Sequence, residues 1–422
     1  MTEDLKLYVA FNWVIYMASS FQPPAEWYST IDKSTGPLLD IYDRHPRIKS
    51  NFSVGGWVGR WLNENRPEFV ERLRGGVHDK RFEIVNRPYF HATMSMLAYD
   101  EADEQIKRSL DINEEVWGVR PVGAHHNGWP WDPVTAKALV DNGVDYQLLT
   151  NWQLQNYTDP PITDPQAYYR AAKLHTIEDS TISSMFVSLS RDDIGIPQDM
   201  SPLHFLEVLS GKRPVDHFKQ GIERIQKSNT EGDKLVLLFN DSEVFWRDPH
   251  TGATGLSQQE MEDRFEEILT FLEECPYVEF TTCKDYLKKF PPTQTYFLRP
   301  SVSPFSPGQG FDAWADGAFK QAYNLNIQCA RATEDIHITE SIIRLAEKIG
   351  GDVGPAKGIL ENAWENLMLS KTAVGRALAP REAVSIWCAE YALSASRDAR
   401  RAIDAIEFPN FPNGNQEKSD RI

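Results

Sequence analysis

One stretch constrains the fold of this chain more than any other: the apolar run at residues 235–239, which leads directly into acids and aromatics. Five consecutive apolar residues leave no side for water, so the run predicts a strand covered on both faces, as in a parallel sheet or an α/β barrel. Asp241 and Glu243 follow the carboxyl end of this strand. Catalytic groups collect at that end in such barrels, although Asn-Asp-Ser is also ordinary turn composition, so a turn-capping role for Asp241 is the alternative.

Short strand patterns alternate with helical patterns over the first two thirds of the chain, which predicts a barrel built from β-α units. The expected strands are residues 7–13, 48–54, 81–86, the end of a fourth strand near 121–125, 145–150, 185–193, 235–239 and 278–282. Residues 151–184 form a long polar stretch that we expect to be a lid or a wall of the site.

The pair Pro291-Pro292 marks the expected end of the barrel, because a Pro-, Ser- and Gly-rich crossing follows it. We therefore expect a barrel domain at residues 1–292 and a helical domain at 293–406. Residues 407–422 are polar and are expected to be a disordered tail.

The composition limits the partners and the location of the protein. A formal net charge of −17 disfavours nucleic acid and anionic membranes as partners. No apolar run approaches the roughly 20 residues that span a bilayer, and the N-terminus enters a strand pattern without a signal peptide. Four cysteines without CxxC spacing indicate reduced thiols in a cytoplasmic protein, with the oligomeric state left open.

Polar and aromatic residues gather at the predicted strand ends and form the candidate substrate-contacting set. Aromatic rings beside carboxylates suit the apolar faces of sugars, although tryptophan also fills barrel cores. This set consists of Asn12, Trp13, His91, His125, Trp129, Trp131 and Trp246. No metal site is expected, because the adjacent His125 and His126 would point to opposite faces of a strand.

Four stretches in this order resemble glycoside hydrolase family 57. They are residues 45–49, residues 82–91, residues 120–133 and residues 240–243. The resemblance implies an incomplete (β/α)7 TIM-like barrel followed by a C-terminal helical bundle. It also implies action on α-glucans or related glycosides with retention of configuration and without a cofactor. In this resemblance Asp241 matches the acid/base aspartate and His91 a sugar-contacting histidine.

The chain departs from the family pattern at two places. The position of the family's nucleophilic glutamate falls on Gly128, and the first strand has Asn12-Trp13 where the family has His-x-His. Retention needs two carboxyl groups roughly 5–5.5 Å apart, and inversion roughly 6.5–9.5 Å. Either Glu243 or Asp132 serves as the second carboxylate, or the mechanism is inverting, or hydrolysis has been lost.

Three functions are therefore compared. The first is an enzyme that cleaves or transfers a glycosidic bond of an oligosaccharide, with Asp241 as proton donor and Glu243 as its partner. The second is a sugar-binding or regulatory protein on a scaffold without its nucleophile. The third, ranked last, is a metal-dependent deacetylase-like hydrolase that uses His125 or His126 with Asp241.

Overall fold

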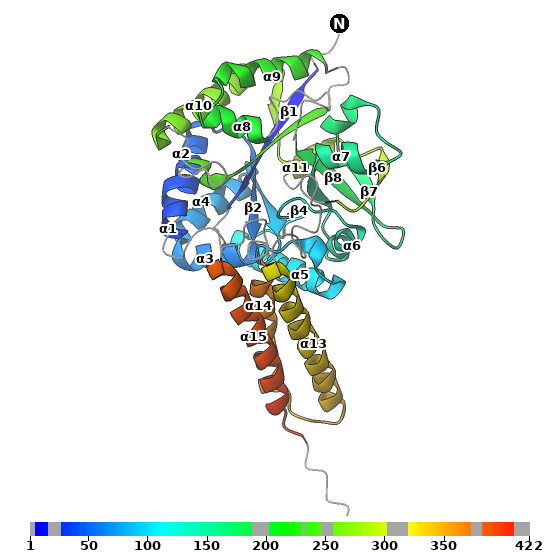
Figure 1. Ribbon diagram of the computed structural model, residues 1–422. Coiled ribbons are helices and arrows are strands. Elements are labelled where there is room, and N and C mark those ends of the chain that lie inside the picture. Colours follow the sequence, from blue (N-terminus) through cyan, green and yellow to red (C-terminus); the bar gives the residue numbers. More distant parts are fainter. Residues whose placement is uncertain are drawn as a thin grey trace, which may run out of the picture. The chain divides into compact units, whose positions relative to one another are not determined.

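The computed structural model describes residues 5–15, 27–187, 202–229, 233–245, 256–301, 320–372 and 382–408. Contacts divide the chain into two compact units, residues 1–311 and residues 312–422. The first unit contains the sheet and the helices that cover it, and the second consists of long helices (Figure 1).

The first unit is organised by β1 (Leu7–Val14), which pairs in parallel with β9 (Lys234–Asp241) along its whole length. On its other side β1 pairs with β10 (Val278–Phe280) and then with β2 (Ser50–Gly55). Parallel pairing continues through β3 (Phe82–Arg87), β4 (Gly123–His125), β5 (Tyr146–Thr150) and β8 (Thr181–Val187). No ladder joins β8 to β9 within the described ranges, so the expected incomplete barrel is confirmed.

Helices follow the strands and cover the outside of the sheet, as β-α-β connections require. After β1 and β2 come α1 (Trp27–Thr30), the π-helix η2 (Ile31–Thr35), α2 (Gly36–Arg44), α3 (Gly56–Asn65) and α4 (Pro67–His78). The later ones are η3 (Met94–Met96), α5 (Tyr99–Trp117), α6 (Pro133–Asp141), α8 (Pro202–Leu209), α9 (Val215–Lys227), α10 (Gln258–Glu274) and α11 (Cys283–Lys289).

Each strand divides its side chains between two hydrophobic clusters, because successive residues point to opposite faces. In β1, Val9 and Phe11 belong to the outer cluster beneath the helices, whereas Tyr8 and Ala10 belong to the inner cluster. In β9 the inner cluster takes Leu235, Leu237 and Phe239. Both faces are therefore buried, as the run at 235–239 predicts.

Residues 151–184, expected to be a lid or a wall of the site, contain several short elements of regular structure. They form α7 (Asn151–Tyr157), β6 (Thr158–Asp159), the 3-10 helix η4 (Pro165–Tyr169) and β7 (Ala172–His175) before β8. β7 runs antiparallel to β8 and pairs with β11 (Thr295–Leu298), which also pairs with β6. The sheet thus continues past Pro291-Pro292.

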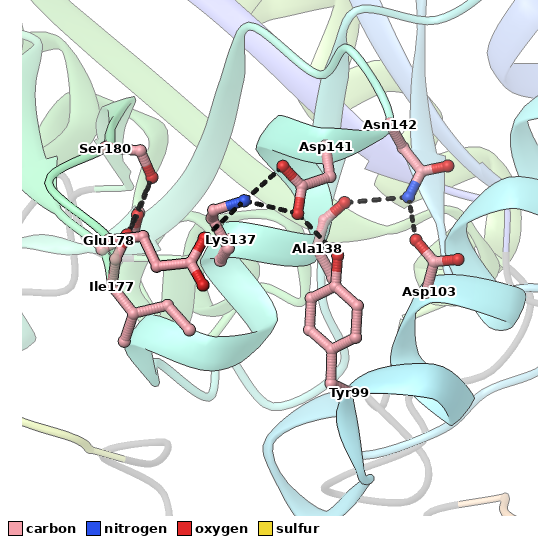
Figure 2. A network of polar contacts seen from close by, with 10 residues as sticks. Tyr99, Asp103, Lys137, Ala138, Asp141, Asn142, Ile177, Glu178 and Ser180 are labelled. Atoms are coloured by element: carbon pink, nitrogen blue, oxygen red, sulfur yellow. Dashed lines mark hydrogen bonds and ion pairs between the residues drawn. The ribbon is translucent and has the colours of Figure 1, made fainter.

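A polar network ties the β7–β8 turn to α5 and α6 (Figure 2). Lys137 Nζ donates to both oxygens of Asp141, and it lies 3.4 Å from Glu178 Oε2 in the turn. The hydroxyl of Tyr99, the first residue of α5, donates to Asp141 Oδ2 at 2.5 Å. The Asp141 carboxylate therefore links α5 to α6, and Lys137 extends the network to the β7–β8 turn.

The second unit contains α13 (Lys320–Lys348), α14 (Gly354–Ser370) and α15 (Glu382–Asp404), which lie side by side (Figure 1). α13 runs as a single helix through residues 320–348. The buried side chains of Cys329, Trp364 and Ala392 belong to one core shared by the three helices. Glu407, expected in the tail, pairs with Asp352, and residues 409–422 lie outside the described residues.

All four cysteines of the chain are free thiols. In the described parts of the chain, no helix combines the length and the apolar character needed to cross a membrane.

Candidate active site

The carboxyl ends of the parallel strands bring a set of polar and aromatic side chains together, which we call the rim cluster. It consists of Arg87, His91, His125, His126, Trp129 and Phe239. Arg87 follows Val85 by two residues and therefore shares its inner face of β3. By the same alternation His125 shares the inner face of β4 with Gly123. The side chains of Arg87 and His125 therefore both point toward the barrel axis.

Three rings of the rim cluster are in contact. The ring of Trp129 lies against that of Phe239 with centroids 4.6 Å apart, and the His125 imidazole lies 4.8 Å from Phe239 and 5.7 Å from Trp129. Trp129 is 5% exposed and His125 is 2% exposed. His125 Nδ1 has no hydrogen-bond partner among the described residues, so a ligand hydroxyl reaching it would satisfy a buried polar atom.

The imidazoles of the rim cluster are held neutral. Burial lowers the pKa of His126 to about 3, with a further contribution from the Arg87 guanidinium. Burial and Arg87 also lower the pKa of His91 and of His125 well below the usual range, and Arg87 Nη2 lies 3.5 Å from His91 Nδ1. A neutral imidazole both donates and accepts, which suits hydroxyl groups better than a cation would.

Asp241 is the last residue of β9 and lies opposite Val14 of β1. It follows Leu237 and Phe239 on the same alternation, so its partly buried carboxylate shares their inner face. Its backbone N–H donates to Asn240 Oδ1 at 3.0 Å. The strand therefore presents Asp241 just beyond Phe239, the residue that contacts His125 and Trp129.

Glu243 lies in the 3-10 helix η7 (Ser242–Phe245), two residues past the end of β9, and is 1% exposed. The hydroxyl of Ser34 donates to the backbone carbonyl of Ser242, and the side chains of Ser242 and Thr35 share a hydrogen bond of 2.9 Å. The residues of η2 thus fix the turn that carries Glu243.

Two tryptophans of the candidate set lie in the outer core. Trp13 is 1% exposed and packs in the outer core on Phe245, with its Nε1 donating to the Tyr42 hydroxyl. Trp131 is also 1% exposed, and its Nε1 donates to Leu298 O at 2.8 Å. Both indoles are buried in the outer core, so neither presents a face on which a sugar can stack. An aromatic ring near a strand end can pack in the outer core as readily as it can face the rim.

Asn12 and Asp132 have structural partners. Asn12 is buried on β1 opposite Phe239 of the rim cluster, and its Oδ1 accepts from the hydroxyl of Ser53 at 3.0 Å, whereas its Nδ2 has no hydrogen-bond partner among the described residues. Asp132 is the N-cap of α6 and accepts from the backbone N–H groups of Val134 and Thr135, each at 2.9 Å. The Asp132 carboxylate is therefore committed to the helix start. Trp246 lies outside the described residues.

Gly128 sits in a left-handed turn, a conformation that glycine adopts without strain. Its φ is 70°, and Trp129, which follows it, has a φ of 46°, so two successive residues are left-handed. The N–H of Trp129 donates to His126 O at 3.1 Å, which closes the turn. Where the family resemblance expects a glutamate, this chain turns sharply and brings Trp129 against Phe239.

Gln153 and Arg87 were not singled out from the sequence. Gln153 is fully buried in α7, and its amide N–H groups donate to Trp129 O at 2.6 Å and to Ser301 Oγ at 3.1 Å. Its Oε1 accepts from the backbone N–H and the hydroxyl of Thr150 at the end of β5. The pattern Thr-x-x-Gln after a predicted strand is a capping-box signal and points to this helix start.

The possible metal ligands of the described residues do not form a metal-binding cluster. Across the described residues, no three His, Cys, Asp or Glu side chains are grouped so that they could hold one.

The fold and the rim cluster together define an α/β-barrel protein with a cluster of polar and aromatic side chains at the carboxyl ends of the strands. The sequence matches the family model for glycosyl hydrolase family 57 over residues 21–299, more than half of the chain, and the chain belongs to this family.

Its curated relatives include an α-amylase of Pyrococcus abyssi and a 4-α-glucanotransferase of Thermococcus litoralis. They are 20% and 22% identical over 63% of this chain, and the aligned regions cover only 37% and 36% of those proteins. Among solved structures, the Thermococcus litoralis 4-α-glucanotransferase superimposes with a TM-score of 0.65 at 15% identity, covering 94% of this chain and 59% of that one. A branching enzyme of Thermococcus kodakaraensis gives a TM-score of 0.65 at 13% identity, covering 95% and 90%.

Proposed function

We propose that this protein is a carbohydrate-active enzyme that cleaves or transfers a glycosidic bond in an α-glucan or a related oligosaccharide. Asp241 acts as the general acid/base, donating a proton to the glycosidic oxygen. The observation that carries the proposal is the place of Asp241 on the inner face of β9, directly beyond Phe239 and its contacts with His125 and Trp129. The names of the relatives, an α-amylase and a 4-α-glucanotransferase, support the choice of substrate class.

In this proposal the neutral His91 and His125 and the Arg87 guanidinium bind sugar hydroxyls. Glu243, buried two residues beyond Asp241, is the second carboxyl group or orients the first. The four free thiols support a reducing compartment, the cytoplasm, as the proposed location.

The test is turnover of maltooligosaccharides by the wild-type protein and by Asp241→Asn. Loss of a general acid removes about 10²–10⁴ of the rate, so the variant is expected to lose nearly all activity. Asp145→Asn is the matched control, because Asp145 is exposed at the opposite end of the barrel, just before β5. Wild-type turnover by Asp241→Asn would refute the role of Asp241.

A second candidate function is favoured by the turn at Gly128: sugar binding without hydrolysis. The left-handed pair Gly128-Trp129 brings an indole, not a carboxylate, to the end of β4. Saturable oligosaccharide binding in titration calorimetry, with no products after prolonged incubation, would support this second function over the first.

A further inference from the structure

A row of five aromatic rings runs outward from the segment that carries His91. We call it the aromatic row: Phe90, Trp57, Trp27, Trp61 and Tyr28. Successive ring centroids are separated by 5.3 Å, 4.9 Å, 5.9 Å and 5.0 Å in that order. Every ring therefore contacts the next, although the residues come from three separate segments of the chain.

The row begins at the carboxyl end of the barrel. Trp57 is the second residue of α3, which starts immediately after β2, and its backbone N–H donates to Tyr89 O at 3.0 Å. Phe90 is the next residue and His91 follows it, so the first ring adjoins the rim cluster in the chain. Trp57 and Trp61 are four residues apart on α3 and share one face of the helix.

Four of the five rings of the aromatic row are more exposed than the residues of the hydrophobic core. Trp27, Trp57 and Trp61 are only partly buried, and Tyr28 is 40% exposed. Trp57 is not part of the hydrophobic core beneath the helices. The Nε1 of Trp27 is buried and has no hydrogen-bond partner among the described residues.

The outer end of the row is held in place. The hydroxyl of Tyr28 donates to Asn65 Oδ1 at 2.8 Å, and the guanidinium of Arg66 lies 4.4 Å from the Tyr28 ring centroid. Arg66 is itself fixed by two hydrogen bonds to Asp32, at 2.8 and 3.0 Å. Rings that are ordered before a ligand arrives bind it at a lower entropic cost.

We propose that the aromatic row binds the part of an oligosaccharide that extends beyond the rim cluster. The inference rests on the proposed function and adds to it a preference for long chains. The apolar faces of pyranose rings lie on aromatic side chains, and the partly buried Trp27, Trp57 and Trp61 and the exposed Tyr28 supply such surfaces. Phe90, 3% exposed, only joins these rings to the segment of His91.

The experiment compares the affinity for maltotriose with that for maltoheptaose in the wild-type protein and in Trp61→Leu. Leucine keeps an apolar side chain against the core but removes the flat ring. The wild type is expected to bind maltoheptaose more tightly than maltotriose. In Trp61→Leu the affinity for maltoheptaose should fall about tenfold, the equivalent of about 1.4 kcal/mol. The affinity for maltotriose should change less than about twofold, because it fits the rim cluster alone.

Two further variants complete the design. Trp61→Phe keeps an aromatic ring and should retain most of the gain with chain length. Phe297→Ala removes an exposed aromatic side chain from β11, near the other end of the sheet, and should behave as the wild type. If Trp61→Leu does not fold, Trp57→Leu provides the same test, because Trp57 does not pack on the core.

The possible failures are distinct. If the wild type binds both sugars and Trp61→Leu weakens both equally, or neither, the aromatic row does not select long chains and the inference is wrong. If the wild type binds no maltooligosaccharide of any length, the proposed function fails, and the inference fails with it.

Discussion

The buried carboxyl group of Glu83 should make the stability of the first unit depend on pH in an unusual direction. Glu83 lies on the inner face of β3, where Tyr146 Oη donates to its Oε1 and the backbone N–H of Lys284 to its Oε2, both at 2.8 Å. Gly123 leaves room for the Tyr146 ring, since a Cβ there would lie 2.1 Å from it. Burial raises the pKa of Glu83 from 4.5 to about 7, although these hydrogen bonds oppose the shift.

The sign follows from proton binding. Between pH 4.5 and about 7 the folded protein holds a proton on Glu83 that the unfolded chain has released. The stabilisation is complete below pH 4.5 and is lost as the pH rises through about 7, amounting to about 3 kcal/mol in total.

Glu83→Gln tests this reasoning. An amide resembles the protonated acid, because its oxygen can accept from Lys284 N–H and its NH₂ can donate to the Tyr146 hydroxyl. Urea unfolding followed by tryptophan fluorescence should give equal free energies of unfolding for the two proteins near pH 4.5. At pH 8 the variant should be more stable by up to about 3 kcal/mol.

The control is Glu279→Gln on β10, which removes an exposed carboxylate paired with Lys289. Solvent screens that pair, so no step of this size should appear. A difference between Glu83→Gln and wild type that stays constant from pH 4.5 to 8 would refute the reasoning.

Three further predictions concern the carboxyl end of the barrel. Gly128→Glu should cost about 1–2 kcal/mol, seen as a lower thermal midpoint, because a side chain is forced into the left-handed region, and it should not increase turnover of maltooligosaccharides. Gln153→Glu removes both donors of the amide and leaves Trp129 O unsatisfied, at a cost of about 1–3 kcal/mol, whereas Ser301→Ala removes a single partner and should lower the midpoint less. His126→Gln should reduce the loss of stability on acidification: the pKa of His126 is about 3 in the folded protein, so the unfolded chain takes up the proton first as the pH falls below 6.5. Unfolding at pH 7.5 and pH 5 measures the difference.

The sequence predicts the barrel well because its strands are buried on both faces. Runs such as residues 235–239 have no alternative placement in a soluble domain, and β9 forms where they predict it. The short strands β6, β7 and β11 were missed because two to four residues carry no readable period. Their pairing depends on contacts between residues far apart in the chain, which propensity does not contain.

The candidate site was harder to predict, because the face on which a side chain lies depends on a one-residue register. Trp13 shares the outer face with Val9 and Phe11, which the alternation of β1 would have indicated. The spacing of Trp57 and Trp61, four residues apart in a helix that follows a strand, is a readable signal that was not used. The assignments of Asp241 and Glu243 remain predictions.

The packing inside the barrel limits the routes by which a ligand can leave the rim cluster. Tyr8, Leu148, Met185 and Leu237 fill the space beneath the rim cluster, and Glu83 and Tyr146 are hydrogen-bonded to each other within it. This packing provides no passage along the axis through the described strands. A ligand bound at the rim cluster would therefore not leave through these strands toward the amino-terminal end of the barrel.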